Sequence, residues 1–316
     1  MKKSYANSHF YLAIYNTLKK YQLYLQYYHY SFNDNIQESS LIFMVDGRLH
    51  HGGMADRFAG LCTSFALSKI NRVPFHVNYI FPFNLEDFLL PNKYDWTIDR
   101  NKISYNKKNS FLAMSMGACF KSFKSNKQNH IYSNFWDIDY INKIYNTNFT
   151  LKNLFDELFK PTEYLSIKLD LFTKEIGGQY IGVVFRFQQL LGDFVEGEFP
   201  ILKEQERELL KQNCYNKLKQ ISEENQDYKI LVTSDSVTFL NFIKDINHVY
   251  IIPGDLVHID YIGDADKSIY AKSFFDFYML RNSIKIINVI GGGLMPSGFP
   301  LFAARSSNVY FERISL

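Results

Sequence analysis

Cysteine is scarce in this sequence: Cys62, Cys119 and Cys214 are the only three, and they are far apart along 316 residues. An odd number of distant cysteines argues against a disulfide scaffold and predicts a reducing compartment. The eight histidines include no His-x-x-x-His pair, so nothing indicates a zinc site. The Gly-x-Ser-x-Gly elbow of hydrolases and the Gly-Lys-Ser/Thr step of Walker loops are also absent.

Long hydrophobic runs and one-sided charge are lacking as well. No run of about 18 apolar residues occurs, so no transmembrane helix is expected. Lys2 and Lys3 precede no apolar stretch, so no signal peptide is expected either. The net charge of +3, without a long Lys/Arg tract, argues against a nucleic-acid partner. With 47% hydrophobic and 21% charged residues, the composition is typical of a folded soluble protein, which we place in the cytoplasm.

Aromatic residues are abundant, with 29 Phe and 23 Tyr among the 316 residues. Codon bias toward Phe, Tyr, Asn, Lys and Ile is the simpler explanation, and platforms on which sugars stack are the alternative. Residues 8–30 carry apolar side chains at three- and four-residue steps, which predicts a helix. This N-terminal helix has three uses that stay open: intramolecular packing, self-association, or a peripheral membrane contact. Intramolecular or subunit packing is favoured, because Lys19 and Lys20 are the only cations on its polar face.

The rest of the sequence alternates apolar strands with amphipathic helices, which indicates an α/β protein. Residues 41–45 and 73–77 are predicted as strands around a helix, so a βαβ unit begins near residue 41. Residues 82–153 show only loops and short helices, which we interpret as acceptor-binding insertions. Further strands are predicted at 180–185, 229–233, 249–252 and 284–290, and helices at 162–174, 203–223 and 273–281. We predict an N-terminal extension over 1–38 and two Rossmann-like domains over 39–176 and 177–316, hinged at Gly177-Gly178.

A glycine-rich segment is the most informative part of the chain. The strand at 284–290 leads into Gly291-Gly292-Gly293, then Ser297-Gly298-Phe299, and a helix is expected to start near Ala303-Ala304. Glycines at a strand end allow a ligand to approach the backbone, and a following helix presents free N–H groups. This pattern predicts a diphosphate site.

A second glycine pair, Gly52-Gly53, stands near the other end of the chain, and Asp56 and Arg57 follow it. Such a loop can contact a phosphate or an acceptor hydroxyl. The simpler alternative is a tight β–α turn, with Asp56 and Arg57 as solvated residues of the first helical turn.

Two predicted strands end in polar residues at the edge where α/β proteins bind ligands. Arg186 ends one of them, and its guanidinium fork suits a diphosphate, unless it pairs with a local carboxylate such as Asp193 or Glu196. Ser234-Asp235-Ser236 follows another, where these residues can bind a nucleotide or cap the helix that follows.

One Asp-x-Asp triplet, Asp264-Ala265-Asp266, has the form that metal-dependent glycosyltransferases use to hold a divalent cation. It lies in a polar Gly/Asp loop, where such triplets are common by chance. Asp137 and Asp139 are weaker candidates still. We therefore predict no metal site and no cofactor.

Three elements in this order resemble the metal-independent fucosyltransferase superfamily. Its early Gly-Gly-Leu-Gly-Asp-Arg loop is similar to residues 52–57, and Asn71-Arg72-Val73-Pro74-Phe75 is similar to the βαβ unit that follows. The central His-x-Arg-Arg strand end is matched in part by residues 184–187. The late elements are similar to residues 233–235, 275–280 and 296–299, so the resemblance spans about residues 41–305.

This resemblance implies a GT-B fold, in which two Rossmann-like domains face a central cleft, with the acceptor on the N-terminal and the donor on the C-terminal domain. It implies a GDP-sugar donor such as GDP-fucose, inversion at the anomeric carbon, and no metal. Arg186 would hold the β-phosphate, Asp235 the guanine, and Ser297, Gly298 and Phe299 the diphosphate, with Gly52, Gly53 and Ser234 contributing to the nucleotide-sugar site. Val184 and Phe187 stand where the motif has its histidine and second arginine.

The resulting hypothesis is an inverting glycosyltransferase that acts on a glycan or lipid-linked glycan in surface polysaccharide synthesis, at the cytoplasmic face of a bacterial membrane. An inverting transfer needs a base, for which Asp193, Glu196 and Asp56 are all candidates. Two alternatives stay open: the same fold with another nucleotide sugar, and a non-catalytic protein that binds a nucleotide sugar or a glycan.

Overall fold

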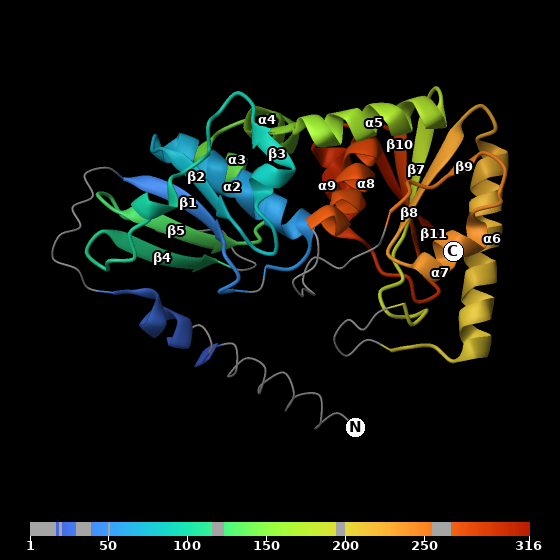
Figure 1. Cartoon of the computed structure of the whole chain (residues 1–316), viewed down its shortest axis with the longest axis horizontal. Coiled ribbons are helices and arrows are strands. Elements are labelled where there is room, and N and C mark those ends of the chain that lie inside the picture. Colours follow the sequence, from blue (N-terminus) through green and yellow to red (C-terminus); the bar gives the residue numbers. More distant parts are fainter. Residues whose placement is uncertain are drawn as a thin grey trace.

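Two parallel β-sheets, each packed against helices, form the molecule (Figure 1). The computed structural model describes residues 17–18, 21–29, 39–49, 51–115, 123–193, 200–254 and 267–316. The first sheet has the order β2-β1-β5-β4, made of Phe75–Tyr79, Ser40–Val45, Gln128–Ser133 and Ser110–Ser115. The second has the order β11-β10-β7-β8-β9, made of Tyr310–Ser315, Lys285–Ile290, Tyr180–Phe185, Lys229–Ser234 and Val249–Tyr250.

The βαβ unit predicted near residue 41 is present. All six residues of β1 are buried, and helix α2 (Met54–Asn71) connects it to the parallel strand β2. The helix lies so close to the sheet that a Cβ on Gly60 would stand 1.9 Å from the Ser133 carbonyl oxygen. Glycine at this position therefore sets the distance between α2 and β5.

The prediction of loops and short helices across 82–153 is wrong at three places. Strands β4 and β5 lie there and complete the first sheet, and the short strand at Leu89–Pro91 pairs antiparallel with Phe159–Pro161. All six residues of β5 are buried although three of them are Gln128, Asn129 and His130. The Asn129 amide donates to the carbonyl oxygens of Lys124 and Lys127, each at 3.0 Å. Polar side chains with partners of this kind can be buried, but they hide the apolar pattern of a strand. The same stretch also holds η1 (Leu85–Asp87), β3 (Leu89–Pro91), η2 (Arg100–Lys102), α3 (Ile138–Tyr145) and α4 (Leu151–Leu158).

The second sheet follows the predicted strands, with β11 added at its edge and β9 shorter than expected. Helix α9 (Gly298–Arg305) begins five residues before the predicted start at Ala303, because Ser297 provides its N-cap. Strand β6 (Phe159–Pro161) leads into α5 (Glu163–Ile176), which runs from one sheet to the other (Figure 1). The remaining helices are α6 (Glu204–Glu224), α7 (Val237–Ile243), η3 (Lys267–Tyr270) and α8 (Ala271–Arg281).

The end of the predicted N-terminal helix packs on the first sheet. Residues 21–27 are helical, and Tyr27 is 3% exposed in a cluster with Ile42 and Tyr132. The Tyr27 hydroxyl lies 2.6 Å from Nδ1 of His130, and Tyr28 accepts the backbone N–H of Leu112 at 2.7 Å. Intramolecular packing is thus confirmed for this end of the helix, whose first residues lie outside the described part of the chain.

His130 makes the stability of this packing dependent on pH. Burial, with a smaller contribution from the Arg48 charge, lowers the pKa of His130 from 6.5 to about 3. The unfolded chain then binds one proton more than the folded chain between these two values. His130 should therefore contribute a loss of about 1.4 kcal/mol in the free energy of unfolding per pH unit as the pH falls below about 6.5.

Urea titrations at pH 7.5, 6.5, 5.5 and 4.5 measure this loss, and His130→Asn should flatten the slope between pH 6.5 and 4.5 relative to the wild type. His248→Asn is the control, because His248 is exposed. Equal slopes for the His130→Asn variant and the wild type would contradict the prediction.

A single aromatic core joins the two sheets. Phe58 of α2 stacks on Phe277 of α8 and Phe302 of α9, each with ring centroids 6.1 Å apart, and meets Phe155 of α4 edge-on at 5.6 Å. All four rings are at most 1% exposed. Helices α8 and α9 lie between the sheets in Figure 1, so this core fixes the position of one sheet relative to the other.

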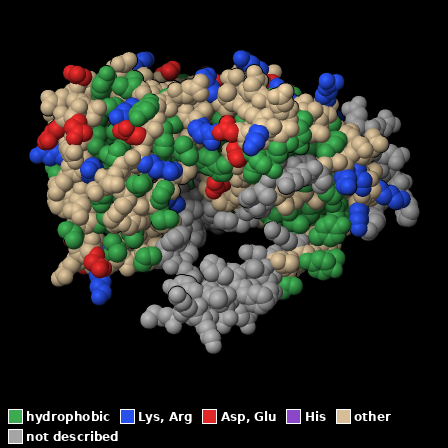
Figure 2. All heavy atoms as spheres, turned by 180° about the vertical axis from the view of Figure 1, so that it is seen from behind, with side chains coloured by type: hydrophobic (Ala, Val, Ile, Leu, Met, Phe, Trp, Pro, Cys, Tyr) green, Lys and Arg blue, Asp and Glu red, His purple; other side chains and the backbone are tan. Residues whose placement is uncertain are grey.

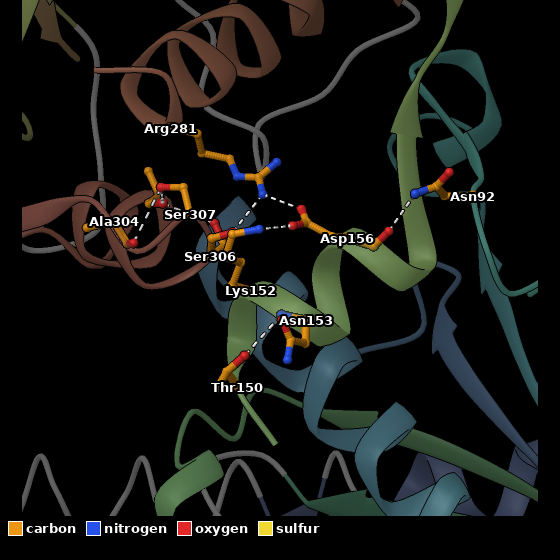
Figure 3. A network of polar contacts seen from close by, with 10 residues as sticks. Asn92, Thr150, Lys152, Asn153, Asp156, Arg281, Ala304, Ser306 and Ser307 are labelled. Atoms are coloured by element: carbon orange, nitrogen blue, oxygen red, sulfur yellow. Dashed lines mark hydrogen bonds and ion pairs between the residues drawn. The ribbon is translucent and has the colours of Figure 1, made fainter. Parts of the chain in front are cut away.

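Arg281 adds a polar link beside this core (Figure 3). Its Nη2 donates to Oδ1 of Asp156 on α4 at 2.7 Å and to the carbonyl oxygen of Ser306, after α9, at 2.6 Å. Its guanidinium lies 4.5 Å from the centroid of the Phe155 ring. Lys152 holds the other carboxylate oxygen of Asp156 at 2.6 Å. The last residue of α8 is thereby tied to both α4 and the end of α9.

Acidic and basic side chains are interspersed over the described part of the face in Figure 2, in keeping with the small net charge. Among the described residues, no helix has the length and apolar character needed to span a bilayer.

Candidate functional site

The site is built around the carboxyl ends of β7 and β8, which are neighbours in the second sheet. Arg186 follows β7 and Asp235 follows β8, and the parallel register that pairs Phe185 with Ser234 places them side by side. Nη1 of Arg186 lies 3.2 Å from Oδ2 of Asp235, and the Arg186 side chain is 26% exposed. The sheet therefore presents a guanidinium at the edge where ligands bind in this fold class.

Asp235 holds the turn that follows Arg186. Its Oδ1 accepts the backbone N–H of Phe187 and its Oδ2 that of Gln188, both at 2.8 Å. Burial raises the pKa of Asp235, and the Arg186 guanidinium and the two N–H groups oppose that increase. The structure places the Asp235 carboxylate beside Arg186, a pairing that was not among the predicted ones. Glu196, one of the two carboxylates predicted for this role, lies outside the described residues. The predicted contact of Asp235 with guanine stays a prediction.

Ser236, which follows Asp235, caps the next helix. Ser236 is the N-cap of α7 and accepts the N–H of Phe239 at 3.0 Å, which confirms the capping interpretation of this segment. Ser234 accepts the N–H of Ser236 at 3.1 Å. Asp193 accepts the Ser236 hydroxyl at 2.5 Å and both the N–H and the hydroxyl of Thr238, at 2.9 and 2.6 Å. The Asp193 carboxylate is thus engaged at the start of α7, and its role as a base stays a prediction.

The glycine triplet forms a tight turn rather than an open cradle. Gly291, Gly292 and Gly293 all have positive φ, and the turn closes with the Leu294 N–H donating to the Gly291 carbonyl at 3.0 Å. A Cβ on Gly292 would stand 2.6 Å from a Leu316 methyl, and one on Gly293 would stand 3.2 Å from a Leu190 methyl. Gly292 and Gly293 leave room for Leu316 and Leu190, and all three glycines are exposed. That they admit a ligand stays a prediction.

The turn carries the chain to the site edge. The Met295 N–H donates to the Arg186 carbonyl at 3.2 Å, and Asn288 of β10 accepts the Ser297 N–H at 3.1 Å. Ser297 caps α9 by accepting the N–H of Phe299 at 3.3 Å. The segment from Ser297 to Phe299 therefore lies on the same edge as Arg186, as predicted, while its contact with a diphosphate stays a prediction.

The first glycine pair begins α2, with Gly52 at φ +69° and Gly53 as the N-cap, which makes no side-chain cap. Arg57 is 2% exposed; its Nε donates to the Gly52 carbonyl at 2.9 Å and its Nη1 to the Phe81 carbonyl at 3.0 Å. The alternative of a solvated Arg57 is therefore wrong: this guanidinium is buried and fixes the loop. Whether Gly52 and Gly53 contact a nucleotide sugar stays a prediction.

Asp56 lies beside Trp136, a residue that the sequence did not single out. The indole Nε1 donates to Oδ1 of Asp56 at 2.6 Å. A Cβ on Gly298 would stand 3.1 Å from Cζ2 of Trp136, so the same indole rests on the first turn of α9. Trp136 therefore contacts both the first turn of α2, which follows Gly52-Gly53, and the first turn of α9, which follows the glycine triplet. The sequence feature that could have identified Trp136 is its position three residues after the strand β5, but the apolar pattern does not reveal that strand.

Other predicted residues fall elsewhere. Glu196 and the Asp264/Asp266 pair lie outside the described residues. Asp137 caps α3, and Asp139 pairs with Arg305 at 3.2 Å. The described residues include no group of three or more His, Cys, Asp or Glu side chains able to hold a metal ion.

Comparisons by sequence find neither a matching family model nor a matching curated protein. Comparison by structure finds the GDP complex of an Arabidopsis thaliana FUT1 variant at a TM-score of 0.54 and 10% identity, covering 90% of this chain and 71% of that one. It also finds the fucosyltransferase NodZ from Bradyrhizobium at a TM-score of 0.52 and 11% identity, covering 84% and 92%. NodZ α-1,6-fucosyltransferase co-crystallized with GDP matches at 0.51, with 12% identity and coverage of 84% and 91%. The chain is similar in fold to these proteins, which confirms the predicted α/β architecture of the GT-B type.

Proposed function

We propose that this protein is an inverting, metal-independent glycosyltransferase that moves a sugar, fucose in the first instance, from a GDP-sugar to a hydroxyl of a glycan acceptor. The shared fold supports it, because NodZ and FUT1 structures contain GDP and one NodZ structure was soaked with GDP-fucose. We assign the donor to the unit over 177–316 and the acceptor to the unit over 39–176, each of which contains one parallel sheet.

The observation that carries the proposal is the place of Arg186. Arg186 directly follows β7, and its side chain is 26% exposed. Its backbone carbonyl accepts the N–H of Met295, in the segment that leads into α9. A permanent cation beside a helix start suits a diphosphate, whose negative charge grows as it departs. Asp235 supports this role by holding both the guanidinium and the turn that follows it.

The acceptor side supplies the base in this proposal. Asp56 is favoured over Asp193 for its place: it contacts Trp136, which lies against Gly298 in the first turn of α9. The Asp193 carboxylate instead accepts three hydrogen bonds at the start of α7. Asp56 takes the proton of the acceptor hydroxyl, and the acceptor oxygen bonds to the anomeric carbon from the face opposite the diphosphate. The bond between that carbon and the diphosphate oxygen breaks, and GDP leaves with Arg186 balancing its charge.

The central His-x-Arg-Arg motif is changed at two positions in this chain. Two alternatives therefore stay open: a different nucleotide-sugar donor, and a protein that binds a nucleotide sugar without turnover. Phe187, at the second arginine position, is fully buried, with its ring centroid 4.9 Å from that of Phe239. Val184, at the histidine position, is 5% exposed. Both side chains belong to the core, so the donor base and sugar must be recognised by other residues.

The proposal also includes a cellular setting. We place the enzyme in surface polysaccharide synthesis, in the cytoplasm of a bacterium, with a glycan or lipid-linked glycan as acceptor. The exposed side chains Leu18, Tyr21 and Leu25 of the N-terminal segment, each more than 60% exposed, are the surface offered for self-association or contact at the inner face of the membrane.

A thermal-shift panel with GDP, UDP, CMP and ADP, each with and without EDTA, tests the proposal first. GDP alone should raise the melting temperature, by an amount that EDTA does not change, since a ligand that binds only the folded state stabilises it. GDP release from GDP-fucose with glycan acceptors then measures turnover. A shift with UDP that requires a metal would overturn the donor assignment, and a GDP shift without turnover for any GDP-sugar and acceptor would favour the binding protein.

A further inference from the structure

The segment that follows β5, residues 134–136, clamps the first glycine loop and reaches the donor side. We propose that Trp136 is a positioning residue, which holds the Asp56 carboxylate in place and makes that placement depend on the first turn of α9. This inference rests on the proposed function, in which Asp56 takes the acceptor proton.

The contact with Asp56 is short and directional. The indole has one N–H, and it donates to Oδ1 of Asp56 at 2.6 Å. A hydrogen bond to a carboxylate is stronger than one between neutral groups, so it favours one orientation of that side chain. The second oxygen, Oδ2, lies over Gly52, where a Cβ would stand only 2.8 Å from it. The carboxylate is therefore contacted by Trp136 at one oxygen and lies close to Gly52 at the other.

The contact with the donor side involves the other end of the indole. A Cβ on Gly298 would stand 3.1 Å from Cζ2 and 3.3 Å from Cη2 of Trp136, so the ring uses the space that glycine leaves at the start of α9. The ring also meets Phe302 edge-on, with centroids 5.7 Å apart and planes at 88°. A shift of α9 must therefore move the indole, and the indole carries the partner of Asp56.

The rest of the loop is fixed by independent contacts. Asn134 donates to the His51 carbonyl at 2.5 Å, and its amide oxygen lies 3.2 Å from Nδ1 of His51. Arg57 donates to the Gly52 carbonyl at 2.9 Å. With the backbone held by Asn134 and Arg57, loss of the indole N–H should affect the Asp56 side chain and leave the loop in place.

Trp136→Phe removes the N–H and keeps a ring against Gly298, so it tests this role directly. We expect kcat for transfer from GDP-fucose to fall about 10- to 100-fold, as for a reacting group displaced by a fraction of an ångström to an ångström. KM for the donor and Kd for GDP should stay within about two-fold, because the donor contacts are retained. In an Asp56→Asn background the same change should have no further effect on kcat, because the residue it positions no longer acts as a base.

The chain offers a matched control in its only other tryptophan. Trp96 is 1% exposed and donates its Nε1–H to the Leu158 carbonyl at 2.7 Å, away from the site. Trp96→Phe makes the same chemical change and should leave kcat unchanged. An equal fall in kcat with Trp136→Phe in the wild-type and Asp56→Asn backgrounds would overturn the proposal, as would an unchanged kcat in the wild-type background.

An NMR measurement that needs no turnover tests the positioning role of Trp136 separately from the proposed glycosyltransferase activity. The Trp96→Phe variant assigns the two indole N–H resonances in a ¹⁵N spectrum. Asp56→Asn should move the Trp136 resonance. GDP binding at α9 should shift the same resonance. An indole resonance indifferent to Asp56→Asn overturns the positioning role even if the enzyme is active. Absence of turnover with a resonance that responds to both changes refutes the assigned activity and leaves the mechanical link intact.

Discussion

Replacing Arg186 by alanine should lower kcat for transfer from GDP-fucose by about 100- to 1000-fold, the usual effect of removing one preorganised charge-stabilising group. The guanidinium is tied to Asp235 at 3.2 Å and so needs little reorganisation as charge develops on the departing diphosphate. Its interaction grows in the transition state, so kcat should fall more than the affinity for GDP. Steady-state GDP release and GDP titration measure the two effects separately.

Two variants control this result. Arg186→Lys keeps the charge and loses the planar fork, so it should recover only part of the lost rate. Arg313→Ala removes an exposed arginine from edge strand β11 of the same sheet and should leave kcat unchanged. Because Arg186→Ala also leaves Asp235 without a guanidinium partner, melting curves must show that the variant is folded at the assay temperature. A folded variant with kcat within about three-fold of wild type would contradict the proposal that Arg186 stabilises the departing diphosphate.

Replacing Phe58 by alanine should lower the free energy of unfolding by about 3–5 kcal/mol, as is usual for truncating a buried phenylalanine. Phe58 is 1% exposed and contacts aromatic rings from α4, α8 and α9, so its loss leaves a cavity where both sheets meet. Because one core serves both sheets, they should unfold in one cooperative transition whose midpoint drops by on the order of 10 °C. Calorimetry and urea titration measure the size of the loss and the number of transitions.

Phe242→Ala is the matched control, since the Phe242 side chain is 39% exposed on α7. It should reduce the free energy of unfolding by less than about 1 kcal/mol. Two separate transitions, with Phe58→Ala lowering only one of them, would show that the sheets unfold independently and that the aromatic core does not couple them.

The strands that the sequence predicted best are those buried on both faces by apolar side chains. β1, β7 and β8 are almost continuous apolar runs, because parallel strands at the centre of a sheet contact helices on both faces. The end of such a run also marks the sheet edge at which ligands bind, so the sequence identifies Arg186 and Asp235 as candidate site residues. The structure then placed the two side chains 3.2 Å apart, a contact that only the register of β7 and β8 creates.

The parts that were missed depend on partners distant in sequence. β5 is a fully buried strand that contains Asn129 and His130. The Asn129 amide donates to the Ser40 carbonyl, and His130 contacts the Tyr27 hydroxyl, so both have partners about a hundred residues away. Arg57 follows the same rule, since its Nη1 donates to the Tyr79 hydroxyl and the Phe81 carbonyl, more than twenty residues away. A polar residue gives no sign of burial when the partner that offsets its desolvation lies far along the chain.

The sequence by itself determined the α/β alternation, the two glycine elements and the strand ends that carry Arg186 and Asp235, because these depend on local apolar pattern and backbone freedom. Only the tertiary structure decided that the glycine triplet packs against Leu190 and Leu316, and that Trp136 joins Asp56 to Gly298. These are contacts between segments tens to more than a hundred residues apart. The glycine contacts depend on the packing within the second sheet, and the Trp136 contacts on the aromatic core between the sheets; no local pattern encodes either.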